Sequence, residues 1–177
     1  MNKKALINLK QISLSTALLT ALVFTHNAVS ENGYSTGNNK DWQWDTTKAT
    51  KYAVTVNNQG SLLGKFCSSE DGSCIYMTYL GTDCEERSKR PATLSSNAGT
   101  LKVTLGCKHL SDNHYFSITQ PEKVEALVKR SDYLKISMEV KPNQVRQEEF
   151  SMAGSAKAIE NLDFNMQVLC YRGCDGK

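Results

Sequence analysis

Cysteines and histidines are the residues of this sequence whose types and spacing could do chemistry. The six cysteines follow one another at spacings of C-x6-C, C-x9-C, C-x22-C, C-x62-C and C-x3-C, without the CxxC pairs typical of zinc sites. An even number in a chain delivered to an oxidising compartment predicts three disulfides, and hence no free thiol to act as a nucleophile. These cysteines are Cys67, Cys74, Cys84, Cys107, Cys170 and Cys174.

A small group around Cys107 is the one candidate for a metal site. His109 and His114 lie close to Cys107 in the sequence CKHLSDNH, and Asp112 adds a carboxylate. The competing interpretation is a turn over residues 110–113, with the two histidines exposed on either side of the turn and Cys107 in a disulfide. We expect the turn, because structural zinc sites usually combine four ligands at short, paired spacings.

No segment of the sequence has the pattern of an active site. A Ser–His–Asp triad would have to use His109 or His114, and no serine lies in a Gly-x-Ser-x-Gly elbow. The sequence therefore predicts no catalytic residues, no cofactor and no enzymatic activity.

The disulfide pairing is predicted from the expected strands. A four-residue loop over residues 69–72 would place Cys67 opposite Cys74 in a hairpin, and Phe66 opposite Ile75. Directly opposed residues are close enough for a bridge with slight adjustment. Proximity predicts Cys170 with Cys174, which leaves Cys84 with Cys107.

The elements that must position these residues are mostly strands. Two short helices are expected, one starting at Pro121 with an apolar face of Val124, Leu127 and Val128, the other over residues 156–162. The result is a mainly-β domain, a sandwich or a curved sheet, with an α+β architecture as the alternative. Strands are expected at residues 52–56, 62–67, 74–80, 101–105, 115–118, 134–140, 145–152 and 165–171.

Two further segments are candidates for contacts with a partner. Trp42 and Trp44 share one face of a strand, and we expect burial at the rim of the core; an exposed contact anchor is the alternative. Residues 81–91 carry charges of both signs and are predicted to be a solvated loop.

The first thirty residues have the three parts of a secretory signal. Three lysines precede an apolar run over residues 12–24, and Ala28 and Ser30 suit a signal peptidase, so cleavage is expected between Ser30 and Glu31. The apolar run is too short for a membrane helix, which needs roughly 20 residues. Residues 31–40 are expected to form a flexible tail and residues 41–177 a single domain.

Cleavage would also remove the excess of positive charge. The whole chain has 21 Lys and Arg against 18 Asp and Glu, and the signal takes three lysines with it. A near-neutral product has no overall electrostatic reason to bind nucleic acid or to associate with an anionic membrane. We expect a periplasmic or secreted protein that is not inserted in the membrane.

Residues 150–159 (FSMAGSAKAI) resemble the closing motif of the invasion-associated locus B family of exported bacterial proteins. The order of a tryptophan near the mature start, cysteine-containing strands and an aliphatic strand at residues 134–140 is also similar. The resemblance covers residues 42–163, although no cysteine follows Trp42 as is common in the family, and the C-terminal Cys170 and Cys174 have no counterpart.

The resemblance implies a β-rich protein of the bacterial envelope or secretome, linked to host-cell interaction and without catalytic residues. We therefore expect a binding protein with a protein partner. The alternative is an inhibitor that presents residues 81–91 to the cleft of a hydrolase.

Overall fold

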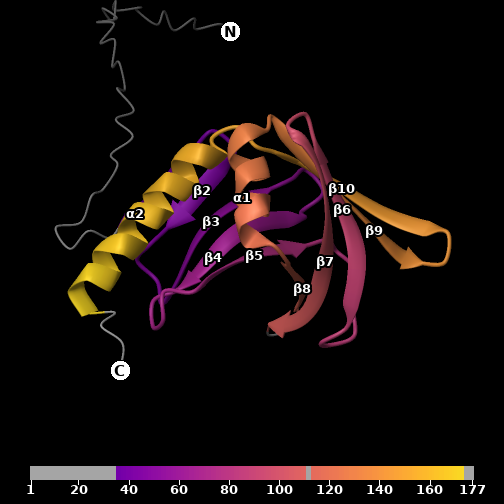
Figure 1. Cartoon of the computed structure of the whole chain (residues 1–177), viewed down its shortest axis with the longest axis horizontal. Coiled ribbons are helices and arrows are strands. Elements are labelled where there is room, and N and C mark those ends of the chain that lie inside the picture. The colour runs from indigo at the N-terminus through magenta and orange to yellow at the C-terminus, as the bar shows by residue number, and fades with distance from the viewer. Residues whose placement is uncertain (1–34, 111–112, 174–177) are drawn as a thin grey trace, which may run out of the picture.

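The computed structural model describes residues 35–110 and 113–173, which form ten strands and two helices (Figure 1). The predicted cleavage site at Ser30 and Glu31 lies outside the described residues. The helices are α1 (Pro121–Arg130) and α2 (Ser155–Gly173). The strands are β1 (Thr36–Asn39), β2 (Trp42–Asp45), β3 (Thr50–Val56), β4 (Leu62–Ser68), β5 (Cys74–Tyr79), β6 (Lys89–Ser96), β7 (Gly99–Leu110), β8 (Asn113–Ile118), β9 (Tyr133–Lys141) and β10 (Gln144–Ser151).

All ten strands belong to one sheet in the order β1-β2-β3-β4-β5-β8-β7-β6-β9-β10, and every neighbouring pair is antiparallel. The mainly-β prediction is confirmed. Of the two architectures offered for it, the curved sheet is the one observed, since the strands do not divide into two packed sheets. The sheet is open, with β1 and β10 as its edges.

The sheet curls until its two halves meet. Although β3 and β10 are far apart in the strand order, the Asn57 amide that follows β3 donates to Glu148 of β10 at 2.7 Å. The Trp42 indole on β2 donates to the Ser151 carbonyl at the end of β10 at 3.0 Å. Glu148 is almost fully buried and is also paired with Arg146 at 2.6 Å. These side-chain contacts join the two ends of the curved sheet, although β10 is not paired with β2 or β3.

Alternate residues along the strands define an inner face and an outer face of the sheet. Both helices lie over the inner face, where α2 packs on β2 and β3 and α1 reaches β5, β7 and β9 (Figure 1). Inner-face side chains such as Leu63, Leu105 and Ile136 are completely buried and form the core with the helices. The outer face is the side on which neither helix packs.

The first helix agrees with its prediction, whereas the second is longer than predicted. In α1 the buried residues are Val124, Leu127 and Val128, as expected. The helix predicted over residues 156–162 continues through the segment predicted as a last strand at 165–171. The buried positions of α2 follow the helical period rather than alternation, and a short apolar run fits both periods until its neighbours are known. Among the α2 side chains that the structure describes, the buried positions are Ser155, Ala158, Ile159, Leu162, Asn165 and Met166.

Three parts of the sheet extend beyond the predicted strands. The tail predicted over residues 31–40 is wrong for Thr36–Asn39, which pairs with β2 as β1. Gly37 suits this pairing because a Cβ there would collide with the Trp44 ring. Strand β6 begins at Lys89, inside the segment predicted as a charged loop, and β7 is longer than residues 101–105. Backbone pairing with neighbouring strands outweighs the polar side chains of these segments.

Among the described residues, neither helix combines the length and apolar character that a membrane crossing requires.

Candidate functional site

The segment between β5 and β6, residues 81–88, is attached to the sheet at several points. The Cys84–Cys107 disulfide joins it to β7. Backbone hydrogen bonds run from the Arg87 amide to the Cys107 carbonyl at 3.2 Å and from the Cys107 amide to the Ser88 carbonyl at 2.8 Å. Cys84 is buried, whereas Glu85, Glu86 and Arg87 are exposed. The segment is a surface loop, as predicted, with a fixed base.

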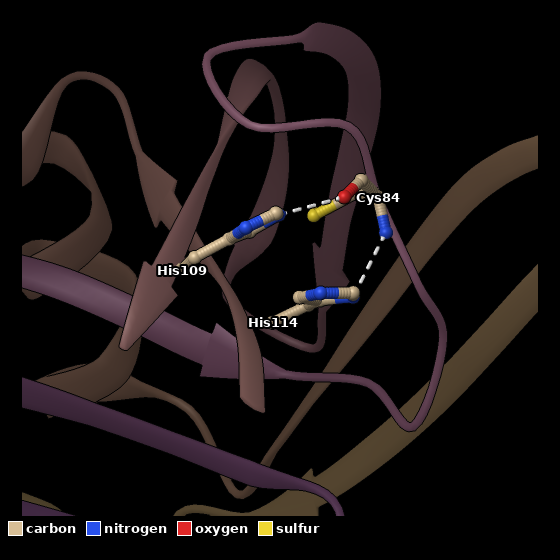
Figure 2. Close-up of side chains that lie close together, drawn as sticks. All are labelled: Cys84, His109 and His114. Carbon is tan, nitrogen blue, oxygen red and sulfur yellow. Dashed lines mark hydrogen bonds between the residues drawn. The ribbon is translucent and has the colours of Figure 1, made fainter. Parts of the chain in front are cut away.

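Two histidines hold the same loop from the β7–β8 hairpin. His109 and His114 face each other in the register, and their rings stack at a centroid distance of 4.2 Å. Figure 2 shows both rings turned toward Cys84. His109 Nε2 lies 2.9 Å from the Cys84 carbonyl oxygen, and His114 Nδ1 lies 3.3 Å from the Cys84 amide nitrogen.

The contact of His109 indicates which of its nitrogens carries the hydrogen: a carbonyl oxygen only accepts, so His109 donates from Nε2. A backbone N–H only donates, so in its contact with Cys84 the His114 ring accepts at Nδ1. Asp83, fully exposed, also lies 3.2 Å from His114 Nδ1, and it would form an ion pair there only with a protonated ring. The histidine pair therefore positions the backbone of Cys84.

The residues that the structure brings together as possible metal ligands differ from those considered in the sequence analysis. Nitrogen and sulfur atoms of Cys84, His109 and His114 lie within 4.8 Å of one another, so Cys84 takes the place expected for Cys107. The Cys84 sulfur is committed to the disulfide and lacks the thiolate form in which cysteine binds metals. Asp112 lies outside the described residues. That no metal binds here stays a prediction.

The other predicted disulfide joins β4 to β5. Cys67 lies opposite Cys74 in the register and is bonded to it, with Phe66 opposite Ile75, as the hairpin predicted. The Ser68 amide donates to the Ser73 carbonyl at 2.9 Å and closes the turn. The Cys170–Cys174 pairing is not tested, because Cys174 and the side chain of Cys170 lie outside the described residues.

Both predicted contact tryptophans are core residues. Trp42 is completely buried and Trp44 is 8 % exposed. The Trp44 indole lies 3.3 Å from the Ser35 hydroxyl oxygen, and the Trp42 indole donates to β10. Burial, the first of the two interpretations, agrees with the structure, and neither ring is an exposed anchor.

A charge cluster under the helices was not predicted. Lys65 of β4 forms ion pairs with Glu125 of α1 at 2.7 Å and with Asp163 of α2 at 2.6 Å. Lys129 of α1 lies 2.7 Å from Glu125 and 3.5 Å from Asp163. The Tyr76 hydroxyl of β5 lies 3.5 Å from Glu125. The cluster connects both helices to the sheet.

The pKa shifts of Glu125 and Lys129 favour the charged forms of both groups. Burial by itself raises the pKa of the Glu125 carboxyl, but the hydrogen bonds and charges of Lys129 and Lys65 outweigh burial and leave it below its usual range. Burial likewise opposes the charge of Lys129, yet Glu125 and Asp163 raise its pKa. Burial and both carboxylates raise the pKa of Tyr76, so its hydroxyl stays protonated.

Sequence reasoning had one signal for this cluster. Lys65 shares a strand face with the apolar Leu63 and with Cys67, and a lysine at such a position needs buried partners. Its partners could not be identified, because they lie on two helices 60 and 98 residues further along the chain.

The outer face carries a belt of apolar side chains across β3, β4, β5 and β8. Tyr52 and Phe66 are opposed residues whose ring centroids lie 6.1 Å apart. Tyr79 and Tyr115 form a second ring pair at 5.8 Å. All four rings are half-buried, while Ile75 and Val56 are 39 % and 52 % exposed. We call these six residues the outer belt.

No protein-family model matches the sequence, and the search of curated proteins finds no significant match. Among solved structures, the crystal structure of invasion-associated protein B from Bartonella henselae is similar, with a TM-score of 0.53. The match covers 72 % of this chain and 95 % of that one at 15 % sequence identity. At this identity the likeness concerns the fold. The chain thus shares its fold with an invasion-associated protein, which confirms the sequence resemblance at that level.

Proposed function

We propose that this protein is an exported, non-catalytic binding protein of the bacterial envelope or secretome, which engages a protein partner through the outer belt. The single observation that carries the proposal is the outer belt itself. Aromatic side chains contribute strongly to binding hot spots, and here they lie on the sheet face opposite both helices.

Export and the absence of catalysis are supported by separate features. The signal sequence predicted for residues 1–30 and the two disulfides agree with delivery to an oxidising compartment. Four cysteines of the described part are bonded in pairs, and both of its histidines contact the Cys84 backbone rather than a serine or a thiol. The similar fold is that of a protein named for invasion, which favours a partner on a host cell.

The test is saturable binding of labelled mature protein, residues 31–177, to intact host cells. We expect the double variant Val56→Lys and Ile75→Lys to lose this binding, because both side chains are solvent-exposed members of the outer belt. Phe164→Lys is the matched control, since Phe164 is a 64 % exposed apolar residue on α2, away from the outer face. Circular dichroism checks that all variants fold.

Two results would contradict this proposal. One is binding that does not saturate or that unlabelled protein does not displace. The other is an equal loss in the Phe164 control, which would show a general response to added charge rather than a role of the outer belt.

An inhibitor of a hydrolase is the second candidate, and the fixed loop over residues 81–88 favours it. Inhibitory loops bind well when they are held in one conformation before binding. Here Arg87 has a positive φ of 65° and is held next to a disulfide. A single hydrolase captured from envelope extracts in equal stoichiometry, and lost with Arg87→Ala, would favour this candidate over the outer belt.

A further inference from the structure

A cavity of about 490 Å³ opens on the outer face where β6, β7 and β8 run side by side. Its floor is formed by Gly106 of β7 and Ser117 of β8, which are opposed in the register. A Cβ at position 106 would lie 3.0 Å from the Ser117 hydroxyl oxygen, so the glycine leaves this floor open. The Ser117 hydroxyl donates to the Gly106 carbonyl at 3.1 Å and lies beneath the cavity.

Three cationic side chains surround this floor. Lys89 of β6 is paired with Gly106, and Lys108 lies two residues further along β7. Such diagonal neighbours are about 7–8 Å apart, close enough for two lysines to reach one anion. Arg87 lines the cavity from the loop, and Glu86 is the one carboxylate among the lining residues. We call Arg87, Lys89 and Lys108 the basic pocket.

The positive charges of the basic pocket are available to a ligand. All three side chains belong to exposed residues, and within residues 35–110 and 113–173 none of them lies within ion-pair distance of a carboxylate. Like charges brought together without a partner repel one another, which an anion would relieve. Arginine and lysine together suit the oxygen atoms of a phosphate or sulfate group.

The basic pocket is also preorganised. Arg87 keeps its left-handed backbone because its amide donates to the Cys107 carbonyl and the neighbouring Cys84–Cys107 disulfide holds the loop on β7. A ligand therefore finds the loop already ordered.

A ring system lies next to the cations. Lys108 is paired with Tyr115, which places both side chains on the outer face, and the Tyr115 ring contacts Tyr79. A ligand with its anionic group in the basic pocket would extend over Tyr115. We propose that the basic pocket binds the phosphate or sulfate ester of a sugar whose ring packs against Tyr115.

The arrangement favours an acidic sugar over nucleic acid. Proteins that hold single strands line a groove with cations so that it follows the backbone over several nucleotides. Here the cations surround one cavity, and beyond Tyr115 the outer face continues with the Tyr79 ring rather than with further cations of the basic pocket. One ester group and its ring match this layout.

This inference deepens the proposed function, since it names the chemistry that the outer face would recognise on its partner. The test is calorimetric titration of the mature protein with a sulfated hexasaccharide and with glucose 1,6-bisphosphate. The same sugars without esters, inorganic phosphate and a single-stranded oligothymidine are titrated in parallel. We expect saturable binding of at least one esterified sugar and no binding of the unesterified sugars. The ester that binds more tightly identifies the anionic group of the ligand as sulfate or phosphate.

Charge variants locate the site. We expect Lys89→Glu combined with Lys108→Glu to weaken ester binding by about tenfold or more. Lys102→Glu makes the same type of change on the same strand and outer face, six residues from Lys108, and should leave the affinity within about twofold. Gly106→Ala, which changes no charge, should also weaken binding by narrowing the floor against Ser117.

The proposal is overturned if neither ester binds, if Lys102→Glu weakens binding as much as the double variant, or if Gly106→Ala has no effect. Inorganic phosphate binding as tightly as the sugar esters, or tighter binding of the oligothymidine, would also overturn it. The Val56 and Ile75 variants tested on cells address the proposed function separately. If neither ester binds the wild-type protein while its binding to cells still depends on Val56 and Ile75, this inference alone is contradicted.

Discussion

The inner face and the outer face of this sheet each carry a group of charges, arranged in opposite ways. In the inner cluster, Lys65 and Lys129 alternate with Glu125 and Asp163, and every charge has a partner within 4 Å. In the basic pocket, three cations surround a cavity with one carboxylate. Paired and partly buried charges join elements together, whereas exposed charges of one sign favour a ligand. The difference separates residues that maintain the fold from residues available for binding.

The largest effect should come from Lys65→Met. This change removes the sheet's cation from Glu125 of α1 and Asp163 of α2 and leaves both carboxylates to share Lys129. Removing one partner of a buried pair is strongly destabilising, and because these carboxylates are partly exposed we expect a loss of about 2–3 kcal/mol in the free energy of unfolding.

Urea denaturation of Lys65→Met measures this loss. Lys157→Met, on an exposed pair at 4.0 Å, is the control and should change stability by less than about 0.5 kcal/mol. If the two variants are equally stable, the inner cluster does not hold the helices on the sheet, and the contrast between the faces fails.

The pH dependence of stability should give a smaller effect. Because the pKa of Glu125 is lower in the folded protein than in the unfolded chain, its contribution is present above the usual glutamate range and is lost as the pH falls through that range. Allowing for solvent screening, this contribution is about 0.5–1 kcal/mol.

Denaturation curves between neutral and acidic pH compare the wild type with Glu125→Gln. The variant should lose stability less steeply as the pH falls, because it lacks the carboxyl that must be protonated. Identical slopes in both proteins would show that Glu125 is not held ionised by Lys65 and Lys129.

The smallest effect on stability should come from the basic pocket. Lys89→Glu and Lys108→Glu remove exposed charges that have no carboxylate partner in the described part of the chain, so the free energy of unfolding should change by less than about 0.5 kcal/mol. Thermal denaturation measures this change. A loss comparable to that of Lys65→Met would mean that these lysines maintain the fold after all.

Local patterns in the sequence were sufficient for the β4–β5 hairpin, for β9 and for α1. Strong alternation in β9 and the short loop between Cys67 and Cys74 each depend on residues close together in the chain, and the structure agrees with both. The failure at α2 has a different cause. Residues 165–171 are apolar at spacings that fit a strand or a helix, and the choice depends on packing against β2 and β3, over a hundred residues earlier.

The candidate sites divide in the same way. The pairing of Cys84 with Cys107 followed once the other cysteines were assigned, but the approach of both histidines to Cys84 depends on how the loop folds back onto the hairpin. The basic pocket could not be predicted from the sequence for a related reason. Arg87 and Lys89 stand next to acidic residues in the sequence, and only the pairing of β6 with β7 brings Lys108 beside them.

The two described disulfides join cysteines that are consecutive in the chain, at sequence separations of 7 and 23. A chain that enters an oxidising compartment N-terminus first, as we propose for this one, exposes its cysteines to oxidation in that same order. Each thiol therefore meets its native partner before the next cysteine emerges. Oxidation during translocation would give this pairing directly, without rearrangement by an isomerase, while β9, β10 and α2 are still to be exported.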